Sequence, residues 1–578
     1  MSTIVVGLNM GHDAGVSMLV DGQVVFAANE ERFSRQKNHV GFPALTLNFL
    51  IENFHPKVDF VAVEGLKVLP LQVSKQEGEH ELELQRLKTN LLDSLGITEY
   101  FWGSNLGILC IQNLGSLLQV RRRAAVVSTI KGLFGQDTEV VFQDHHKSHI
   151  ASSVFGFADK ADGIALSFDA SGEGFCSKVA LITNGSDLNF INHFNLPSFW
   201  SPANIYKNVT DYLGFVPLRH EGKITGLAAY GDSEKCGPIF HEYFGFNTEK
   251  GAFYNKFGYD NSKKVMSKLF SENTKEDVAA GVQENLECTL IKYTNYLVDK
   301  ISPKKKISLY LSGGLFANVK LNQKIFEEDF CKEIFVTPNM GDGGLSLGAA
   351  MLVANRFGPP KKIKNAYLCT GSQSDSLEST LEIYKDKIVP LKLSTHDLVI
   401  TVAQALSFQK IVAVSRGFME YGPRALGNRS ILYQATDPSI NSRLNTLLGR
   451  TEFMPFAPIV RDIDADRFFK LKNGPDIYEY MTITAECHPL AKIEAPAIVH
   501  VDNTARPQVL RRYKNEFVYD LLTEYKSQSK FSILVNTSFN MHEEPIVRTY
   551  RESIESFLRS GIDYLVLENY LIKRTGGV

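Results

Sequence analysis

The 578-residue chain lacks the features that mark secreted, membrane-spanning and nucleic-acid-binding proteins. Its seven cysteines are odd in number and never form a Cys-x-x-Cys pair, which excludes a disulfide framework or cysteine zinc site and is typical of reduced cytoplasmic thiols. No apolar run approaches bilayer length, and no basic segment followed by an apolar one opens the chain, so neither a membrane span nor a signal peptide is expected. A net charge of −2 gives no general reason to expect nucleic-acid binding. We expect a soluble cytoplasmic protein.

Length and composition predict a globular protein with more than one domain. A chain of 578 residues is too long for one hydrophobic core, and its 44% apolar and 22% charged content is ordinary. Residues 355–367 contain Pro-Pro and a lysine cluster, which is typical of an exposed linker. We therefore expect one domain over residues 1–360 and a second over residues 361–578.

A supersecondary unit occurs twice in the first half of the chain. Residues 3–9 predict a buried strand, which a glycine-rich turn and a hairpin on Asp-Gly at 21–22 follow. About 160 residues later the pattern returns, with a buried strand at 163–168, an acidic glycine-rich turn and a hairpin on Asn-Gly at 184–185. The duplication resembles the architecture of actin, sugar kinases and Hsp70, in which two similar subdomains close on a nucleotide. Two unrelated β-meanders are the alternative.

Two further glycine clusters follow predicted strands. Gly313 and Gly314 come after I-S-L-Y-L-S, and Asp342 lies in the G-D-G-G loop after F-V-T-P-N-M. Glycine lets backbone N–H groups approach a phosphate, and a helix N-terminus adds a favourable field. The two clusters together indicate a nucleotide site.

Three histidines lie within five positions in D-H-H-K-S-H. If this run is helical, His145 and His149 are one turn apart, about 6 Å between their Cβ atoms. Two neutral imidazoles so placed can share one metal ion. With 14 histidines in the chain, chance alone gives such a pair about one time in three. Ordinary core or surface histidines are therefore equally open from this run alone.

The second half predicts mixed α/β structure, with a helix near 397–408 and a strand at 410–414. Residues 417–430 concentrate glycine, proline, arginine and asparagine with little apolar periodicity. Arg424 and Arg429 on such a rigid loop suit bidentate recognition of phosphate or carboxylate.

The order of motifs along the whole chain is specific. The motifs are G-H-D-A-G, E-E-R-F-S-R-Q-K-N-H-V-G-F-P, D-H-H-K-S-H, F-D-A-S-G-E-G, E-G-K-I-T-G-L-A-A-Y-G, S-G-G-L-F-A-N, G-D-G-G-L-S-L-G-A-A, E-Y-G-P-R-A-L-G-N-R-S, T-A-R-P-Q-V and N-T-S-F-N. This series resembles the O-carbamoyltransferase family, which includes nodulation-factor and antibiotic-tailoring enzymes. The resemblance implies an α/β protein with a duplicated actin-like N-terminal domain and a YrdC-like, mixed α/β C-terminal domain.

The resemblance also implies a two-step reaction. The C-terminal half would join carbamoyl phosphate to ATP, giving carbamoyl adenylate and pyrophosphate. The N-terminal half would then transfer the carbamoyl group to a hydroxyl of a small-molecule, sugar or nucleoside acceptor and release AMP. The segment 66–135 is where an acceptor pocket could be elaborated. We expect a monomer or homodimer without membrane or nucleic-acid partners, although a modified base stays open as an acceptor.

Site residues carried over by resemblance fall into four groups. The implied ligands of one divalent metal, iron most often in the family with Mn or Zn as alternatives, are His145, His149, Asp169 and Asp342. The implied catalytic residues are His12, as general base, and Lys37. The implied nucleotide-binding residues are Glu173, Gly313, Gly314 and Asn318. The implied carbamoyl-phosphate-binding residues are Arg416, Arg424, Arg450, Arg506, Asn536 and Asn540. A turn histidine that only holds Asp13 is the alternative for His12, and His146 is expected to be structural.

Three positions depart from the family pattern. Leu448, Met454 and His542 stand where the family usually has cations associated with carbamoyl phosphate. Each lost charge-assisted contact is worth about 1.5–3 kcal/mol. Other residues compensate, the acyl donor differs, or the first half-reaction is impaired. A non-catalytic nucleotide-binding homologue is a further alternative, against which the complete metal set argues.

Overall fold

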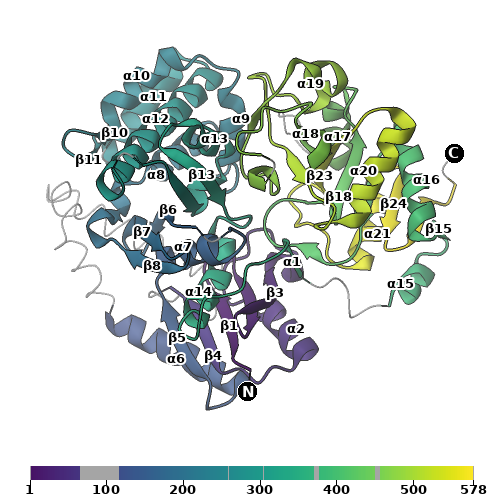
Figure 1. Cartoon of the computed structure of the whole chain (residues 1–578), viewed down its shortest axis with the longest axis horizontal. Helices are drawn as coiled ribbons and strands as arrows, with labels where there is room; N and C mark the ends of the chain where they lie inside the picture. Colours follow the sequence, from purple (N-terminus) through teal and green to yellow (C-terminus); the bar gives the residue numbers. More distant parts are fainter. Residues whose placement is uncertain are drawn as a thin grey trace. The chain divides into compact units, whose positions relative to one another are not determined.

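The computed structural model describes residues 2–65, 116–159, 161–257, 259–303, 305–369, 376–449, 456–474 and 476–576. The chain divides into two compact units (Figure 1). Unit 1 consists of Met1–Glu30, Asn38–Ala317 and Lys324–Ile363, and unit 2 consists of Glu31–Lys37, Asn318–Gln323 and Lys364–Val578. A division at residue 360 would assign the segments Glu31–Lys37 and Asn318–Gln323 to the first domain, whereas their contacts assign them to unit 2.

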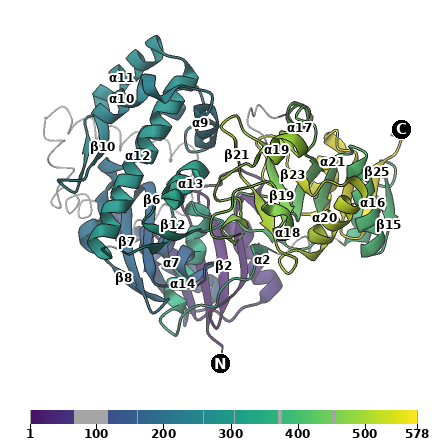
Figure 2. The same ribbon diagram turned by 45° about the horizontal axis from the view of Figure 1, so that its top comes forward.

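Unit 1 contains two sheets, with β2 of the first and β6, β7, β8 and β12 of the second labelled in Figure 2, and the two sheets have the same topology. The first sheet has the order β3 (Gln23–Asn29), β2 (Gly15–Val20), β1 (Ile4–Asn9), β4 (Phe60–Glu64) and β5 (Glu139–Gln143). The second has the order β8 (Asp187–Phe190), β7 (Phe175–Thr183), β6 (Gly163–Gly172), β12 (Ile307–Ser312) and β13 (Cys331–Val336), with β9 (Leu196–Pro197) beside β7. In each, three antiparallel strands are followed by two parallel ones. The predicted duplication, and with it the actin-like architecture of the first domain, is confirmed.

One helix follows the last strand of each sheet, and these two helices pack against each other. Helix α7 (His145–Phe155) follows β5, and α14 (Leu345–Ala354) follows β13 after the short 3-10 turn Asp342–Gly344. A Cβ at Gly348 would lie 1.8 Å from the backbone oxygen of Ser148, so only glycine permits this approach. The packing brings the start of α7 beside the loop that carries Asp342.

Further elements complete unit 1. They are α2 (Ala44–Phe54), α6 (Ser116–Phe134), α8 (Pro202–Tyr212), α9 (Glu221–Ala228), α10 (Ser233–Tyr243), α11 (Tyr259–Glu272), α12 (Lys275–Ile301), and the hairpin β10 (Phe244–Asn247) and β11 (Ala252–Asn255). The long helix α12 begins where the Thr274 side chain accepts a hydrogen bond from the backbone N–H of Asp277. Helix α13 (Val319–Glu327) begins in the segment assigned to unit 2.

Unit 2 is built on one mixed eight-stranded sheet. Its order is β15 (Ile388–Lys392), β25 (Tyr570–Arg574), β24 (Tyr564–Leu567), β16 (Val412–Ser415), β18 (Arg429–Gln434), β23 (Ile533–Ser538), β19 (Ala457–Arg461) and β22 (Gln508–Leu510). Helices α16 (Thr395–Ser407) and α20 (Glu516–Ser529) share an apolar core with this sheet. The smaller elements are α1 (Glu31–Ser34), α15 (Leu377–Ile383), α17 (Ile440–Leu448), α18 (Asp462–Ala465), α19 (Pro489–Glu494), α21 (Tyr550–Arg559), and the pairs β14 (Tyr367–Cys369) with β17 (Met419–Glu420) and β20 (Ala485–Glu486) with β21 (Thr504–Ala505). The predicted mixed α/β character is confirmed.

Across the described ranges, no helix combines the length and apolarity that crossing a bilayer requires.

Candidate functional site

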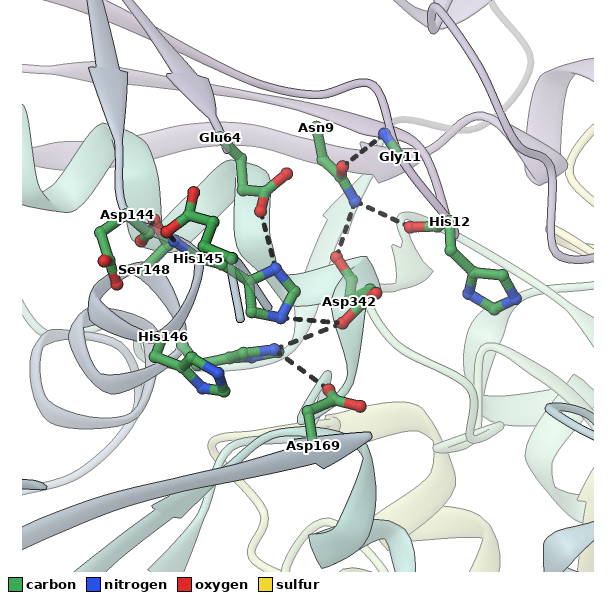
Figure 3. A network of polar contacts seen from close by, with 12 residues as sticks. Asn9, Gly11, His12, Glu64, Asp144, His145, His146, Ser148, Asp169 and Asp342 are labelled. Carbon is green, nitrogen blue, oxygen red and sulfur yellow. Dashed lines mark hydrogen bonds and ion pairs between the residues drawn. The ribbon is translucent and has the colours of Figure 1, made fainter. Parts of the chain in front are cut away.

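Four side chains that the sequence predicts as metal ligands converge in unit 1 (Figure 3). His145 and His149 come from α7, Asp169 from β6, and Asp342 from the turn before α14. One nitrogen or oxygen atom of each lies within 4.8 Å of the others. Nε2 of His149 is 3.4 Å from Oδ2 of Asp169 and 3.3 Å from Oδ1 of Asp342, and Nε2 of His145 is 3.7 Å from the same Asp342 oxygen.

Three atoms of this cluster lack a hydrogen bond in a way that fits a cation. Nε2 of His145, Nε2 of His149 and Oδ1 of Asp342 are buried, and none forms a hydrogen bond within the described part of the chain. Buried polar atoms nearly always have a partner, so three such atoms facing one point indicate a shared ligand. Two imidazole nitrogens and two carboxylate oxygens suit Fe(II), Mn(II) or Zn(II).

The charges of the cluster hold protons in place when no cation is bound. Burial disfavours the protonated form of His145, but Asp342, Glu64 and Asp169 together raise its pKa to about 10. Burial likewise opposes the charge of Asp169, yet His149 and His145 hold the pKa of this carboxyl well below its usual range. Metal ligation requires neutral imidazoles, so metal binding would release protons.

A carboxylate that the sequence motifs miss contacts one of the histidines. Oε1 of Glu64 lies 2.8 Å from Nδ1 of His145, and both side chains are about nine-tenths buried, with exposures of 9% and 10%. Glu64 ends β4 and pairs in register with Gln143, the last residue of β5. Helix α7 begins at His145, two residues after Gln143, so the pairing of Glu64 with Gln143 brings Glu64 close to His145. The contact could have been predicted only from the register of these two strands.

The neighbours of His145 fix its place. A Cβ at Gly172 would lie 2.2 Å from Cδ2 of the His145 imidazole, so the glycine makes room for the ring. The Asp144 carboxylate accepts a hydrogen bond from the backbone N–H of Lys147 at 3.0 Å, which caps α7, and it also pairs with Lys178. His146 does not face the cluster. Its Nδ1 contacts Oγ of Ser167 and its Nε2 contacts the backbone oxygen of Phe175, each at 3.0 Å.

His12 lies in the turn between β1 and β2. Its Nδ1 is 3.1 Å from Oδ2 of Asp13, whose other oxygen accepts a hydrogen bond from the Asn38 amide at 2.9 Å. Nε2 of His12 hydrogen-bonds to no described residue, and a third of the side chain is exposed. Burial lowers the pKa of His12, but Asp13, Asp342 and Asp169 outweigh this and raise it to about 9. The imidazole both holds Asp13 and keeps one nitrogen available.

A buried amide links the His12 turn to the Asp342 loop (Figure 3). The Nδ2 group of Asn9 donates hydrogen bonds to the backbone oxygens of His12 and Asp342, each at 2.9 Å. Its Oδ1 accepts from the N–H of Gly11 at 2.8 Å. Asn29 donates in the same way to the backbone oxygens of Asp13 and Gly343. Two asparagines therefore fix the spacing between His12 and the metal set.

The predicted nucleotide-binding residues are assigned to both units of the chain. The N–H of Gly314 donates to Oδ2 of Asp169 at 3.0 Å, and Gly313, at φ +99°, precedes it in a conformation that favours glycine. Glu173 accepts a long hydrogen bond of 3.4 Å from the N–H of His145. Asn318 belongs to unit 2, where its side chain accepts from the N–H of Leu321. Three of the four are thus beside the metal set in unit 1.

Two arginines of unit 2 have no counter-charge among the residues that the structure describes. Burial lowers the pKa of Arg424 to about 10, and burial together with the charge of Arg424 lowers the pKa of Arg506 well below its usual value. Neither guanidinium forms an ion pair or hydrogen bond with another described residue. Asn536 donates to the backbone oxygen of Ala425 at 3.2 Å, beside Arg424. Two neighbouring, half-buried cations with no carboxylate partner among the described residues indicate an anion site.

The second arginine of the 417–430 loop does not face a ligand. Arg429 is 1% exposed and donates to the backbone oxygens of Arg416, Gly417 and Asn428. The expectation of bidentate anion recognition is wrong for Arg429, because both of its Nη groups donate to backbone oxygens that close the loop. Glu420 completes the closure, since its Oε1 accepts from three backbone N–H groups of residues 426–429.

The other described residues predicted for the donor site contact neighbours within unit 2. Arg416 donates to Oγ1 of Thr395 and stacks on Phe517, 4.4 Å from the ring centre. Asn540 donates to the backbone oxygen of Glu544 at 2.6 Å. Of the two predicted catalytic residues, Lys37 is assigned to unit 2 and His12 to unit 1. Arg450, Met454 and most of the predicted acceptor segment 66–135 lie outside the described residues.

Two of the three departures from the family pattern are neighbours. The backbone N–H of His542 donates to the backbone oxygen of Leu448 at 3.0 Å. The Leu448 side chain is 1% exposed and packs in the core at the end of α17.

A second group with metal-ligand chemistry is a hydrogen-bonded chain instead. His241, Glu284 and Cys288 lie within reach of one ion. The Asn285 amide, however, donates to Nδ1 of His241 and to the backbone oxygen of Phe244, each at 3.0 Å. Nε2 of His241 then carries the proton and donates it to Glu284 at 2.7 Å, which removes the nitrogen lone pair that a metal needs.

Comparison with known proteins matches nearly the whole chain. The family model described as Carbamoyltransferase N-terminus matches residues 4–351, and the one described as Carbamoyltransferase C-terminus matches residues 403–574. The chain is 26% identical to nodulation protein NolNO of Sinorhizobium fredii, with 97% of this chain and 79% of that protein covered. It is 23% identical to the 3'-hydroxymethylcephem-O-carbamoyltransferase of Amycolatopsis lactamdurans, with 99% and 100% covered. Among solved structures, component A of the Acidaminococcus fermentans (R)-2-hydroxyglutaryl-CoA dehydratase is 15% identical at a TM-score of 0.32, with 61% of this chain and 99% of that chain covered.

Proposed function

The chain belongs to the carbamoyltransferase family, and from this premise we propose that it is an ATP-dependent O-carbamoyltransferase. In the proposed reaction, carbamoyl phosphate and ATP form carbamoyl adenylate with release of pyrophosphate. The carbamoyl group then passes to a hydroxyl of a small-molecule, sugar or nucleoside acceptor with release of AMP. Relatives that are named O-carbamoyltransferases support a hydroxyl as acceptor.

The observation that carries the proposal is the convergence of His145, His149, Asp169 and Asp342. A divalent ion held by them, with iron as the first candidate, would neutralise phosphate charge, polarise the reacting centre and offset the carboxylates that raise the pKa of His12. The N–H of Gly314 lies against Asp169, so a glycine-rich turn of the kind that approaches phosphates adjoins the set.

His12 is the proposed general base. Asp13 holds Nδ1, so Nε2 is the nitrogen that would accept the proton of the acceptor hydroxyl. Asn9 ties the backbone of His12 to that of Asp342 and so sets the distance between base and metal set.

Arg424 and Arg506 are the proposed donor-site cations. Their guanidinium groups have no counter-ion among the described residues, so a bound carbamoyl phosphate would supply the missing negative charge.

Release of pyrophosphate tests this function directly. Metal-loaded protein should release pyrophosphate only when ATP and carbamoyl phosphate are both present, and Arg424→Gln should abolish the release. Metal-loaded, folded protein that releases none with both substrates present contradicts the proposal.

A second candidate keeps the fold and changes the donor. It is favoured by the adjacency of Leu448 and His542, two positions at which the family pattern has cations. It predicts ATP-dependent adenylation of another small acid with carbamoyl phosphate inert. A panel of acids in the pyrophosphate assay separates the two, and so does His542→Arg. The arginine of His542→Arg should increase pyrophosphate release with carbamoyl phosphate if carbamoyl phosphate is the donor. If another acid is the donor, this release should stay at zero.

A further inference from the structure

We infer that Glu64 is a positioning residue for the candidate metal set. Its carboxylate fixes the imidazole of His145 so that Nε2 faces the other ligands. This inference rests on the proposed function, because it requires that the set holds a metal ion.

The contact determines which nitrogen of His145 is available. Oε1 of Glu64 lies 2.8 Å from Nδ1 of His145, and an ionised carboxylate only accepts hydrogen bonds. In the neutral imidazole that a metal requires, the proton therefore sits on Nδ1 and the lone pair on Nε2. Nε2 points toward Oδ1 of Asp342, 3.7 Å away (Figure 3).

The sheet holds the Glu64 carboxylate in place. Glu64 is the last residue of β4 and pairs with Gln143 across the parallel pair β4–β5. The N–H of Gly65 then donates to the backbone oxygen of Gln143 at 2.9 Å, which extends the pairing one residue past the contact. The backbone of Glu64 is thus anchored on the strand pair that leads into α7, which keeps its side chain within reach of His145.

The two histidines of the set differ in this support. Nδ1 of His149 is buried and forms no hydrogen bond to any part of the chain that the structure describes, whereas Nδ1 of His145 has Glu64. A carboxylate on the outer nitrogen raises the basicity of a ligating imidazole and orients its ring, and loss of such a partner typically costs 10–100-fold in metal affinity. Glu64 also adds a third negative charge beside Asp169 and Asp342.

Metal affinity of isosteric variants tests the inference. Metal-free wild type, Glu64→Gln, Glu64→Ala and Glu30→Gln are titrated with Mn(II) against a competing chelator, and the melting temperature of each metal-free protein is measured. Glu30 is the matched control. It directly follows β3 of the same sheet and is 1% exposed. Its carboxylate accepts hydrogen bonds from Leu45 and Thr46 and contacts none of the four predicted metal ligands.

Glu64→Gln is expected to weaken Mn(II) binding 10–100-fold with little change in melting temperature, and Glu30→Gln to leave the affinity unchanged. In the Co(II)-loaded protein, Glu64→Gln should also shift the visible absorption bands, which a purely structural role would not move. Wild-type affinity in Glu64→Gln overturns the inference even if Glu64→Ala fails to fold. Wild type that binds neither Mn(II) nor Co(II) overturns the proposed metal set itself, and the inference with it.

Discussion

Adding one methyl group at Gly172 should strongly weaken metal binding without replacing any ligand residue. In Gly172→Ala, the new Cβ would lie 2.2 Å from Cδ2 and 2.6 Å from Cγ of His145, where ordinary contact begins at 3.4 Å. The backbone of Gly172 is outside the left-handed region, so the strain falls on the imidazole. The ring must retreat by about 1.2 Å, several times the ±0.2 Å within which metal–ligand distances are kept. Overpacking of this kind costs about 1–3 kcal/mol, which a protein of this size survives.

The assay compares metal stoichiometry and affinity of Gly172→Ala and Gly132→Ala. Gly132 is the matched control, because it lies in α6 with nothing within 4 Å of its added Cβ. Gly172→Ala should fold, melt a few degrees lower and bind Mn(II) at least about 100-fold more weakly, since an entire ligand is displaced. A Gly172→Ala protein with wild-type affinity would refute the reasoning that His145 ligates from its present position.

Three further perturbations test other parts of the structure. Asn9→Ala removes the side-chain donor to the backbone oxygen of His12 and one of the two donors to that of Asp342, which keeps the N–H of Leu345. Denaturant unfolding should show a loss of about 1–3 kcal/mol, and an unchanged midpoint would contradict the linking role. Arg424→Met should raise the melting temperature of the anion-free protein, because it removes a charge that has no described partner. It should also abolish the increase in melting temperature that inorganic phosphate causes in wild type. A variant that melts at a lower temperature and is still stabilised by phosphate would count against the anion site. Burial opposes the ionisation of Asp502, but His500 and Lys320 outweigh it and hold the pKa of this carboxyl below its usual value. The ionised carboxylate therefore stabilises the fold fully above about pH 4, and this stabilisation is lost as the pH falls. The difference in unfolding free energy between wild type and Asp502→Asn should shrink as the pH falls below about 4, and a constant difference would exclude ionisation of Asp502 as its cause.

The duplicated meanders could be predicted because their turns carry their own local signal. Asp21-Gly22 and Asn184-Gly185 both have positive φ at the two central positions, the conformation that these residue types favour in two-residue hairpins. Alternating and buried apolar runs then gave the strands on each side. Such features are local in sequence, so sequence patterns suffice for them.

Contacts set by strand register could not be predicted in the same way. Glu64 meets His145 only because β4 and β5 pair with Glu64 opposite Gln143, and Asn9 meets Asp342 across 333 residues. Neither residue stands out by type or spacing.

Burial separated residues that look equivalent in the sequence. Arg424 and Arg429 share one loop, yet of the two only Arg429 donates from both Nη groups to backbone oxygens of described residues. Which of two arginines faces a ligand depends on the path of the folded loop, and composition does not encode that path.

The metal content of the purified chain tests the central claim most directly. Wild type, Asp169→Asn and Asp342→Asn are each reconstituted with Fe(II), Mn(II) or Zn(II) and measured by plasma mass spectrometry beside a circular dichroism spectrum. The four converging side chains predict one equivalent of divalent metal per wild-type chain and almost none in either folded variant. Equal metal content in all three proteins, or none in wild type, would contradict it.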